Sequence, residues 1–186
     1  MDLSTTYLGF TLPHPLIPGA SPLSDEIDGV RRLEDAGAPM IVLRSLFEEQ
    51  LVHEQFAALS GIDAHENAFA EAASFFPAAE GFRFGPGSYI EHVDRVKRAV
   101  RIPVVASLNG TTPGAWAEYA QLLEQAGADA LELNLFLVPT DPEESASNIE
   151  ERLLELIGSV RAHVTMPLAI KISSFYTSLP HFARRV

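Results

Sequence analysis

The sequence predicts an α/β fold in which parallel strands alternate with helices and form a barrel. Short apolar runs recur along the 186 residues, helix-like stretches separate them, and each run ends in small or polar residues. Side chains at the carboxyl ends of parallel strands collect at one end of the sheet, where such proteins build their sites. The ends of the runs are therefore the first place to look for function.

The expected elements alternate in order. Five strands are predicted, at 15–20, 39–43, 103–107, 130–135 and 167–172. Helices are predicted between them, at 24–36, 46–59, 88–100, 114–126 and 146–163, with a further helix beginning at 181. Ser24 is the predicted N-cap of the first helix, because its hydroxyl can accept an orphan backbone N–H. A less regular stretch that contains Gly and Pro covers about 60–88.

A weak internal repeat supports the alternation. Residues 33–38 read Leu-Glu-Asp-Ala-Gly-Ala, and residues 123–128 read Leu-Glu-Gln-Ala-Gly-Ala. Arg101-Ile102-Pro103 and Thr165-Met166-Pro167 are matching entries to two of the predicted strands. Recurrence of a helix, a glycine or proline stop, an apolar strand and a polar tip implies parallel strands joined by right-handed crossovers.

Two parallel architectures fit this pattern: an eight-stranded β/α barrel and an open doubly wound sheet. The barrel is favoured because polar residues end every strand, not only those at one switch point. A complete barrel needs eight units and about 250 residues, whereas this chain supplies five. We expect a single domain that is an incomplete barrel, as a fragment or truncated product; the alternative is a fold other than a barrel. Unpaired strand edges then predict a marginally stable chain or a homo-oligomer.

Composition narrows the class of function. The formal net charge of −12 argues against a nucleic-acid surface, which needs clustered Lys and Arg. The chain has no Cys, which excludes disulfides, thiolate metal sites and a Cys nucleophile. No apolar run approaches the roughly 20 residues that span a bilayer, and the N-terminus lacks a signal-peptide pattern. A soluble cytoplasmic protein that acts on a small molecule is the expectation.

Lys171 is the most informative candidate site residue, because it ends the apolar run 168–170. Its ammonium either contacts a ligand inside the barrel or extends into solvent. Asn134 ends the run 130–133; its amide either binds a planar ring ligand or serves a strand-ending turn. The other candidates are residues that end the remaining runs: Ala20, Ser21, Arg44, Ser45, Ser107 and Asn109.

Other residues have competing interpretations. His53-Glu54 and His65-Glu66 suggest a metal site, but the histidines lack the spacing of a helical zinc motif. Solvated surface is favoured, and no metal is predicted. Phe75-Phe76 and Phe82-Arg83-Phe84 either cover a ligand or pack a long loop.

In order and spacing, the motifs together resemble the flavin-dependent dihydroorotate dehydrogenases and their dihydroorotate dehydrogenase-like relatives. The likeness covers nearly the whole chain. The segments that carry it are Tyr7–Phe10, His14–Leu16, Gly19–Ser21, Leu43–Ser45, Ala106–Gly110, Glu132–Leu135 and Ala169–Ile172.

The resemblance implies a barrel whose bottom is capped by an early hairpin, with FMN as the cofactor. It places Ala20 and Ser21 against the flavin. It gives Asn134 contacts with both flavin and substrate, and it brings Lys171 to the flavin ring. It also implies that the flavin phosphate is held by strands of the complete barrel that follow those in this chain.

The chain departs from the family pattern at two positions. Arg44, next to Ser45, stands where the family has Lys, and the two cations differ in shape and hydrogen bonding. The family's catalytic base, a Cys or Ser, falls at Leu137, whose side chain cannot accept a proton. Thr140 is the hydroxyl nearest to that position. The catalytic residue is therefore left unassigned.

Three functions remain open from the sequence. The favoured one is FMN-dependent oxidation of a CH–CH bond, as in pyrimidine biosynthesis, in which Lys171 stabilises negative charge on the reduced flavin. The second is a non-catalytic barrel remnant or partner subunit. The third is a lyase or aldolase barrel in which Lys171 forms a Schiff base. Because Leu137 replaces the base, we expect this chain alone to be inactive or incomplete as a dihydroorotate dehydrogenase.

Overall fold

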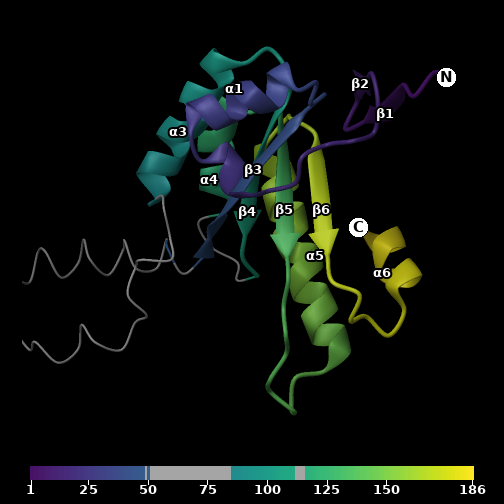
Figure 1. Ribbon diagram of the computed structural model, residues 1–186. Coiled ribbons are helices and arrows are strands. Elements are labelled where there is room, and N and C mark those ends of the chain that lie inside the picture. Colours follow the sequence, from purple (N-terminus) through teal and green to yellow (C-terminus); the bar gives the residue numbers. More distant parts are fainter. Residues whose placement is uncertain (49, 51–84, 112–115) are drawn as a thin grey trace, which may run out of the picture.

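The computed structural model describes residues 1–48, 50, 85–111 and 116–186 (Figure 1). Its centre is a four-stranded parallel sheet in sequential order: β3 (Ile41–Phe47), β4 (Val104–Asn109), β5 (Ala130–Leu135) and β6 (Leu168–Ile172). The predictions of parallel strands at 103–107, 130–135 and 167–172 are confirmed. The strand predicted at 39–43 is present as β3, but it continues to Phe47 and so includes the first two residues of the helix predicted at 46–59. The predicted parallel order is confirmed for these strands as well, because each pairs with its neighbour in sequence.

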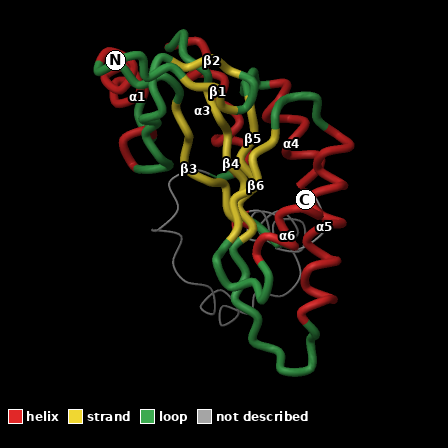
Figure 2. The backbone as a smooth tube through the Cα atoms, turned by 90° about the vertical axis from the view of Figure 1, so that its right-hand side faces the viewer, coloured by secondary structure: helices red, strands yellow, loops and turns green. Residues whose placement is uncertain are grey.

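Helices cover one face of this sheet. They are α1 (Ile27–Asp35), α3 (Pro86–Ala99), α4 (Trp116–Gln125) and α5 (Ala146–His163), and each contacts the next. Their apolar side chains share one core with alternate strand residues, such as Leu43, Leu108 and Leu133. Figure 2 shows α4 and α5 together on one side of the sheet. A doubly wound sheet carries helices on both faces, so in the described part of the chain this arrangement is that of an incomplete β/α barrel.

The remaining helix predictions agree with the structure. The segments predicted at 88–100 and 114–126 correspond to α3 and α4, and 146–163 is α5. Ser145 caps α5, because its Oγ accepts a hydrogen bond from the backbone N of Asn148 at 3.2 Å. The helix predicted to begin at 181 is α6 (Leu179–Arg185). Most of the predicted helix 46–59, the stretch 60–84 and their His and Phe residues lie outside the described residues.

A β-hairpin precedes the sheet. Its strands β1 (Thr5–Tyr7) and β2 (Phe10–Leu12) are antiparallel. Leu8 and Gly9 turn the chain with φ of 50° and 82°, as a two-residue hairpin loop requires. Leu12 is buried with Met40, Val105 and Ala130, on the sheet face opposite the helices. The hairpin lies toward the amino ends of the parallel strands (Figure 1), as the resemblance implied.

The strand predicted at 15–20 is wrong. Pro15 and Pro18 lack backbone N–H groups, so this segment cannot pair regularly. It runs as a loop into a short 3₁₀ helix, η1 (Pro22–Ser24). The predicted N-cap is wrong too. Ser24 Oγ donates to the backbone O of Ser21 at 2.9 Å, and Glu26 occupies the N-cap position of α1.

Both helices of the internal repeat end in the same way. Gly37 and Gly127 have φ of 94° directly after α1 and α4. This is the left-handed conformation that glycine adopts without steric cost at a helix end. The following residue, Ala38 or Ala128, donates its backbone N–H back to the last turn of the helix, at 3.0 Å and 3.1 Å respectively.

The repeat also has a counterpart in side-chain bonding. Glu34 Oε1, at the end of α1, accepts a hydrogen bond from the backbone N of Arg101 at 2.7 Å. Glu124 Oε1, at the end of α4, accepts one from the backbone N of Thr165 at 2.8 Å. These acceptors hold the turns that enter β4 and β6. The two matching entry tripeptides are therefore anchored by equivalent glutamates.

Candidate functional site

The inner face of the sheet, opposite the helices, carries two rows of residues at the carboxyl ends of the strands. The register sets Ser45, Ser107, Glu132 and Ala169 side by side in the lower row. The upper row lies two residues further along each strand, nearer the carboxyl ends, and consists of Phe47, Asn109, Asn134 and Lys171. Residues between them in sequence point to the helices, because side chains alternate along a strand. Five of the predicted site residues therefore share one face: Ser45, Ser107, Asn109, Asn134 and Lys171.

A hydrogen-bonded chain links the lower row. Ser107 Oγ donates to Glu132 Oε1 at 3.0 Å. Ser45 Oγ lies 2.8 Å from Ser107 Oγ, and because Ser107 has a single hydroxyl proton, Ser45 is the donor in that contact. The bonds cross two strand pairs, so they fix the orientation of the Glu132 carboxylate.

Glu132 connects the lower row to the upper row. Its Oε1 lies 3.7 Å from Lys171 Nζ on the neighbouring strand. The Glu132 side chain is 15% exposed, whereas the Lys171 side chain is 55% exposed. The carboxylate is therefore fixed and mostly buried, and it leaves the lysine ammonium accessible from solvent.

Tyr89 bonds to the backbone of Ser107 from the helix side of the sheet, next to a bulge in β3. The register between β3 and β4 shifts between Val42 and Ser45, which disrupts the regular ladder. Tyr89 on α3 reaches this point: its OH accepts from the backbone N of Ser107 at 3.0 Å and donates to the backbone O of Ser107 at 3.3 Å. Burial, reinforced by the charge of Glu132, raises the pKa of the Tyr89 phenol well above its usual range. The phenol stays neutral and can fill both roles.

Arg44 lies within the bulged stretch and forms an ion pair away from the lower row. Its Nη1 donates to Asp25 Oδ2 at 3.0 Å, and the Asp25 side chain is only 3% exposed. Ala20 and Ser21 precede η1, which contacts β3. Ala20 is exposed, and the backbone O of Ser21 accepts the hydrogen bond from Ser24. These three candidates lie around η1, not in the two rows.

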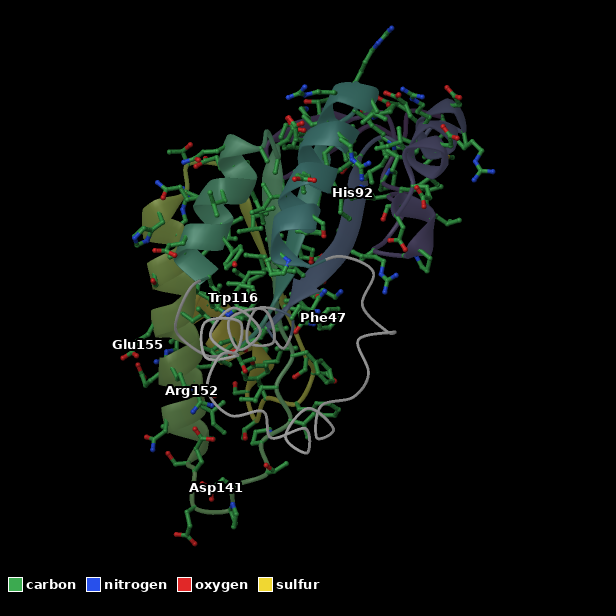
Figure 3. The ribbon with its side chains drawn as sticks, turned by 90° about the vertical axis from the view of Figure 1, so that its left-hand side faces the viewer. Phe47, His92, Trp116, Asp141, Arg152 and Glu155 are labelled. Atoms are coloured by element: carbon green, nitrogen blue, oxygen red, sulfur yellow. The ribbon has the colours of Figure 1, made fainter. Side chains whose placement is uncertain are left out.

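Leu137 and Thr140 follow β5 in a loop that extends beyond the sheet. Figure 3 shows Asp141 at the far tip of this loop, and Phe47 at the end of β3. Leu137 is half-buried and lines a small cleft with Phe175 and Tyr176. Thr140 is exposed. The position that the resemblance gives to the base therefore opens onto an apolar cleft.

Sequence reasoning missed two residues of this arrangement. Glu132 is a charge inside the apolar run 130–135, two residues before Asn134 and so on the same strand face. That spacing was a readable signal. Tyr89 lies in a predicted helix with nothing in the sequence to mark it, because its role depends on the bulge in a strand more than 40 residues earlier.

The upper row offers hydrogen-bonding groups that could bind the polar edge of a planar ring. Two amides and one ammonium offer donors and acceptors to the carbonyl and N–H edge of a planar heterocycle. No group of three His, Asp or Glu side chains in the described ranges could hold a metal ion. In the same ranges, no helix is long and apolar enough to cross a membrane.

The fold and the two rows define the class: a β/α-barrel protein with a polar inner face at the carboxyl ends of its strands. No family model matches the chain. A curated protein of Aeropyrum pernix, named "Putative dihydroorotate dehydrogenase A (fumarate)", is 30% identical over 138 residues. The match covers 72% of this chain, and the chain spans 41% of the length of that relative.

Solved structures share the architecture at low sequence identity. A variant of NCR from Zymomonas mobilis superposes with a TM-score of 0.54 and 10% identity, over 98% of this chain and 61% of that one. Dihydrodipicolinate synthase from Agrobacterium tumefaciens superposes with a TM-score of 0.52 and 13% identity, over 90% of this chain and 47% of that one. At such identities the likeness shows the barrel fold alone.

Proposed function

We propose that this chain is part of an FMN-dependent oxidoreductase barrel of the dihydroorotate dehydrogenase-like group, acting on a small molecule in the cytoplasm. The observation that carries the proposal is the pairing of Asn134 with Lys171 in the upper row. The sequence likeness to the Aeropyrum pernix protein supports the cofactor and the reaction type, oxidation of a CH–CH bond as in pyrimidine biosynthesis.

Four residues of the rows have roles in this function. When bound, FMN supplies an acceptor for the hydride that leaves the substrate. Lys171 would hold the flavin ring through its ammonium, which can stabilise the negative charge of the reduced form, and the amide of Asn134 would donate to and accept from ring or substrate. The Glu132 carboxylate is fixed by Ser107 and restricts the position of the Lys171 ammonium. Glu132 therefore acts through Lys171.

The loop after β5 limits the chemistry of this chain. Leu137 has no proton-accepting atom, and Thr140 is exposed on the extended part of the loop. Loss of a general base lowers a rate by about 10²–10⁴-fold. We therefore expect negligible oxidation of dihydroorotate by this chain alone. Turnover that survives both Thr140→Ala and Lys171→Ala would show that the chemistry lies elsewhere.

Flavin titration tests the proposal. FMN added to the purified chain should lose fluorescence on binding, with modest affinity, because the resemblance assigns its phosphate to strands that follow those in this chain. Lys171→Ala should weaken this binding, whereas Arg98→Ala removes an exposed cation on α3, 79% accessible, and should leave it unchanged. Absence of FMN binding by the unaltered chain would contradict the proposal and favour the non-catalytic barrel remnant or partner subunit.

A Schiff-base lyase is the second candidate, because Lys171 is an accessible amine at a strand end. The sequence has only two lysines, and the other, Lys97, bonds both carboxylate oxygens of Asp129 at 2.7 and 2.6 Å. Borohydride trapping with a small α-keto acid would therefore modify Lys171 in preference to Lys97, and peptide mapping would separate this product from modification of the exposed N-terminal amine. The Glu132 carboxylate lies 3.7 Å from Lys171 Nζ, and this ion pair is a direct part of the first candidate function but has no role in the second.

A further inference from the structure

Two exposed phenylalanines stand beyond the upper row. Phe136 directly follows β5, and Phe175 lies in the loop after β6. Their rings meet edge to face, with centroids 6.4 Å apart and an interplanar angle of 70°. Phe136 is 53% exposed and Phe175 is 75% exposed. Exposed aromatic side chains that gather beside a polar site mark a binding surface more often than isolated ones do.

A small cleft adjoins this pair. It has a volume of about 120 Å³ and is lined by residues of the two loops and of α5, among them Phe175, Leu137, Ile149 and Leu153. An apolar cavity of about 150 Å³ accepts benzene, so the cleft is on the scale of one ring. The aromatic pair and the cleft together are here called the aromatic subsite.

The electrostatics of the aromatic subsite disfavour anions. Charge among its described lining residues comes from Glu150, which pairs with Arg185 at 3.0 Å. Residues 136–139 read Phe-Leu-Val-Pro and contribute no polar side chain. A carboxylate leaving water for this position would need a cation or several N–H donors to replace its hydration. The lining residues offer mostly apolar surface instead, with the hydroxyls of Ser173, Tyr176 and Thr177 as neutral polar groups and no cation among them.

We propose that the aromatic subsite binds a neutral, apolar ring of the substrate, in place of a carboxylate-bearing ring. The proposal rests on the proposed function, because Asn134 and Lys171 would provide the reactive end. Phe136 comes two residues after Asn134, just past the end of β5, and Phe175 comes four residues after Lys171, past the end of β6. Both phenylalanines therefore lie in the loops that continue from the strands carrying Asn134 and Lys171, so a substrate ring held there belongs to the same end of the sheet. The same proposal explains why an apolar residue stands at position 137, because Leu137 lines the cleft that would hold the apolar ring.

Binding of two planar probes without FMN tests the aromatic subsite. Coumarin is a neutral aromatic and orotate is a ring of similar size with a carboxylate. In ligand-observed NMR titrations, coumarin should bind at least tenfold more tightly than orotate. The double variant Phe136→Ser/Phe175→Ser should weaken coumarin binding about tenfold, as expected for loss of aromatic contacts. Leu16→Ser is the control, because Leu16 is 74% exposed in the N-terminal loop, and it should change nothing.

The outcomes separate this proposal from its alternatives. Failure of coumarin to bind, equal binding of orotate, or unchanged coumarin binding in the double variant each overturns it. The remaining alternative is that a second copy of the chain covers the aromatic subsite. Light scattering that shows loss of self-association in a double variant that still binds coumarin would support this alternative. If coumarin binds as expected but FMN does not bind, the proposed function fails while the subsite stands.

Discussion

Glu132 Oε1 lies 3.7 Å from Lys171 Nζ across the β5–β6 pair, and the same oxygen accepts the hydrogen bond from Ser107. The position of the lysine is therefore restricted by a carboxylate that is itself fixed by a neighbouring strand. A lysine that only extended into solvent would have no such fixed partner. The ammonium remains accessible at 55% exposure, so it can contact a ligand that lies over the upper row.

Lys171→Ala should weaken the binding of reduced FMN more than the binding of oxidised FMN, and it should therefore lower the reduction potential of the bound flavin. The reason is that the ammonium stabilises the negative charge that gathers on the reduced ring. A charged contact contributes about 1.5–3 kcal/mol, or roughly one to two decades in affinity. Titration of both redox forms against Arg98→Ala measures the difference. An equal loss for both forms would show that Lys171 only positions the ring.

Glu132→Gln should shift the potential in the opposite direction. The amide keeps an oxygen that accepts from Ser107, but it removes the negative charge that faces Lys171. Because Lys171 is more than half exposed, the effect is expected to be small, about 0.2–1 kcal/mol in favour of reduced FMN. Glu118→Gln, on the exposed face of α4, controls for the change in net charge. A potential that falls in Glu132→Gln would contradict the positioning role.

The fold could be predicted wherever local signals and tertiary packing agree. The helix at 146–163 and the strand at 130–135 match the structure at both ends, since Ser145 caps the helix and an apolar run forms the strand. The strand at 15–20 failed because its apolar residues suggested burial while Pro15 and Pro18 removed the donors that pairing requires. Apolar character alone does not fix backbone hydrogen bonding.

The site could be predicted in part, for a related reason. Residues that end strands were placed by their position in sequence, which is why Asn134 and Lys171 fall in one row. Arg44 and Glu132 required knowledge of the register. The bulge in β3 places Arg44 with Asp25, and the alignment of β4 with β5 brings Glu132 to Ser107. Such relations come from pairing between strands, which no single segment encodes.

Tyr89→Phe should lower the free energy of unfolding by about 1–3 kcal/mol, because it leaves the buried backbone N of Ser107 without the acceptor that Tyr89 provides. Urea denaturation measures the change. Tyr7→Phe is the matched control, since Tyr7 is 42% exposed in the hairpin, and it should have little effect. If Tyr89→Phe leaves the free energy of unfolding unchanged, then the bulge rearranges so that the backbone N of Ser107 finds another acceptor.

The same phenol should limit stability at alkaline pH. The pKa of Tyr89 is raised above its ordinary value of 10.0, mainly by burial. Its contribution is therefore fully present below about pH 10, and it is lost as the pH rises toward the raised pKa, because the unfolded chain releases this proton first. Unfolding free energies at pH 8 to 11 should fall more steeply for the unaltered protein than for Tyr89→Phe. If the free energy of unfolding falls equally steeply with pH in both proteins, then Tyr89 is not the group that limits stability at alkaline pH.

The chain should associate with itself as its concentration rises. Among the described residues, β3 and β6 are the two outer strands of the sheet, and every residue of β6 retains some exposure. Unpaired strand edges with apolar residues promote association. Light scattering over a range of concentrations measures it. A compact monomer that unfolds cooperatively at all concentrations would show that the edges are protected.

Gly110→Ala should disrupt the packing at the end of β4. A Cβ at this position would come within 2.2 Å of Trp116 Cζ2, and Trp116 is only 2% exposed. The indole must move, and such overpacking typically lowers the free energy of unfolding by about 1–3 kcal/mol. Trp116 is the single tryptophan, so its fluorescence reports the shift directly. Gly158→Ala provides the contrast, because Gly158 lies in α5 with no atom near the new Cβ, and alanine should stabilise the helix by about 0.5–1 kcal/mol. If Gly110→Ala leaves both the emission maximum and the unfolding midpoint unchanged, then the Trp116 ring does not pack against Gly110 in solution.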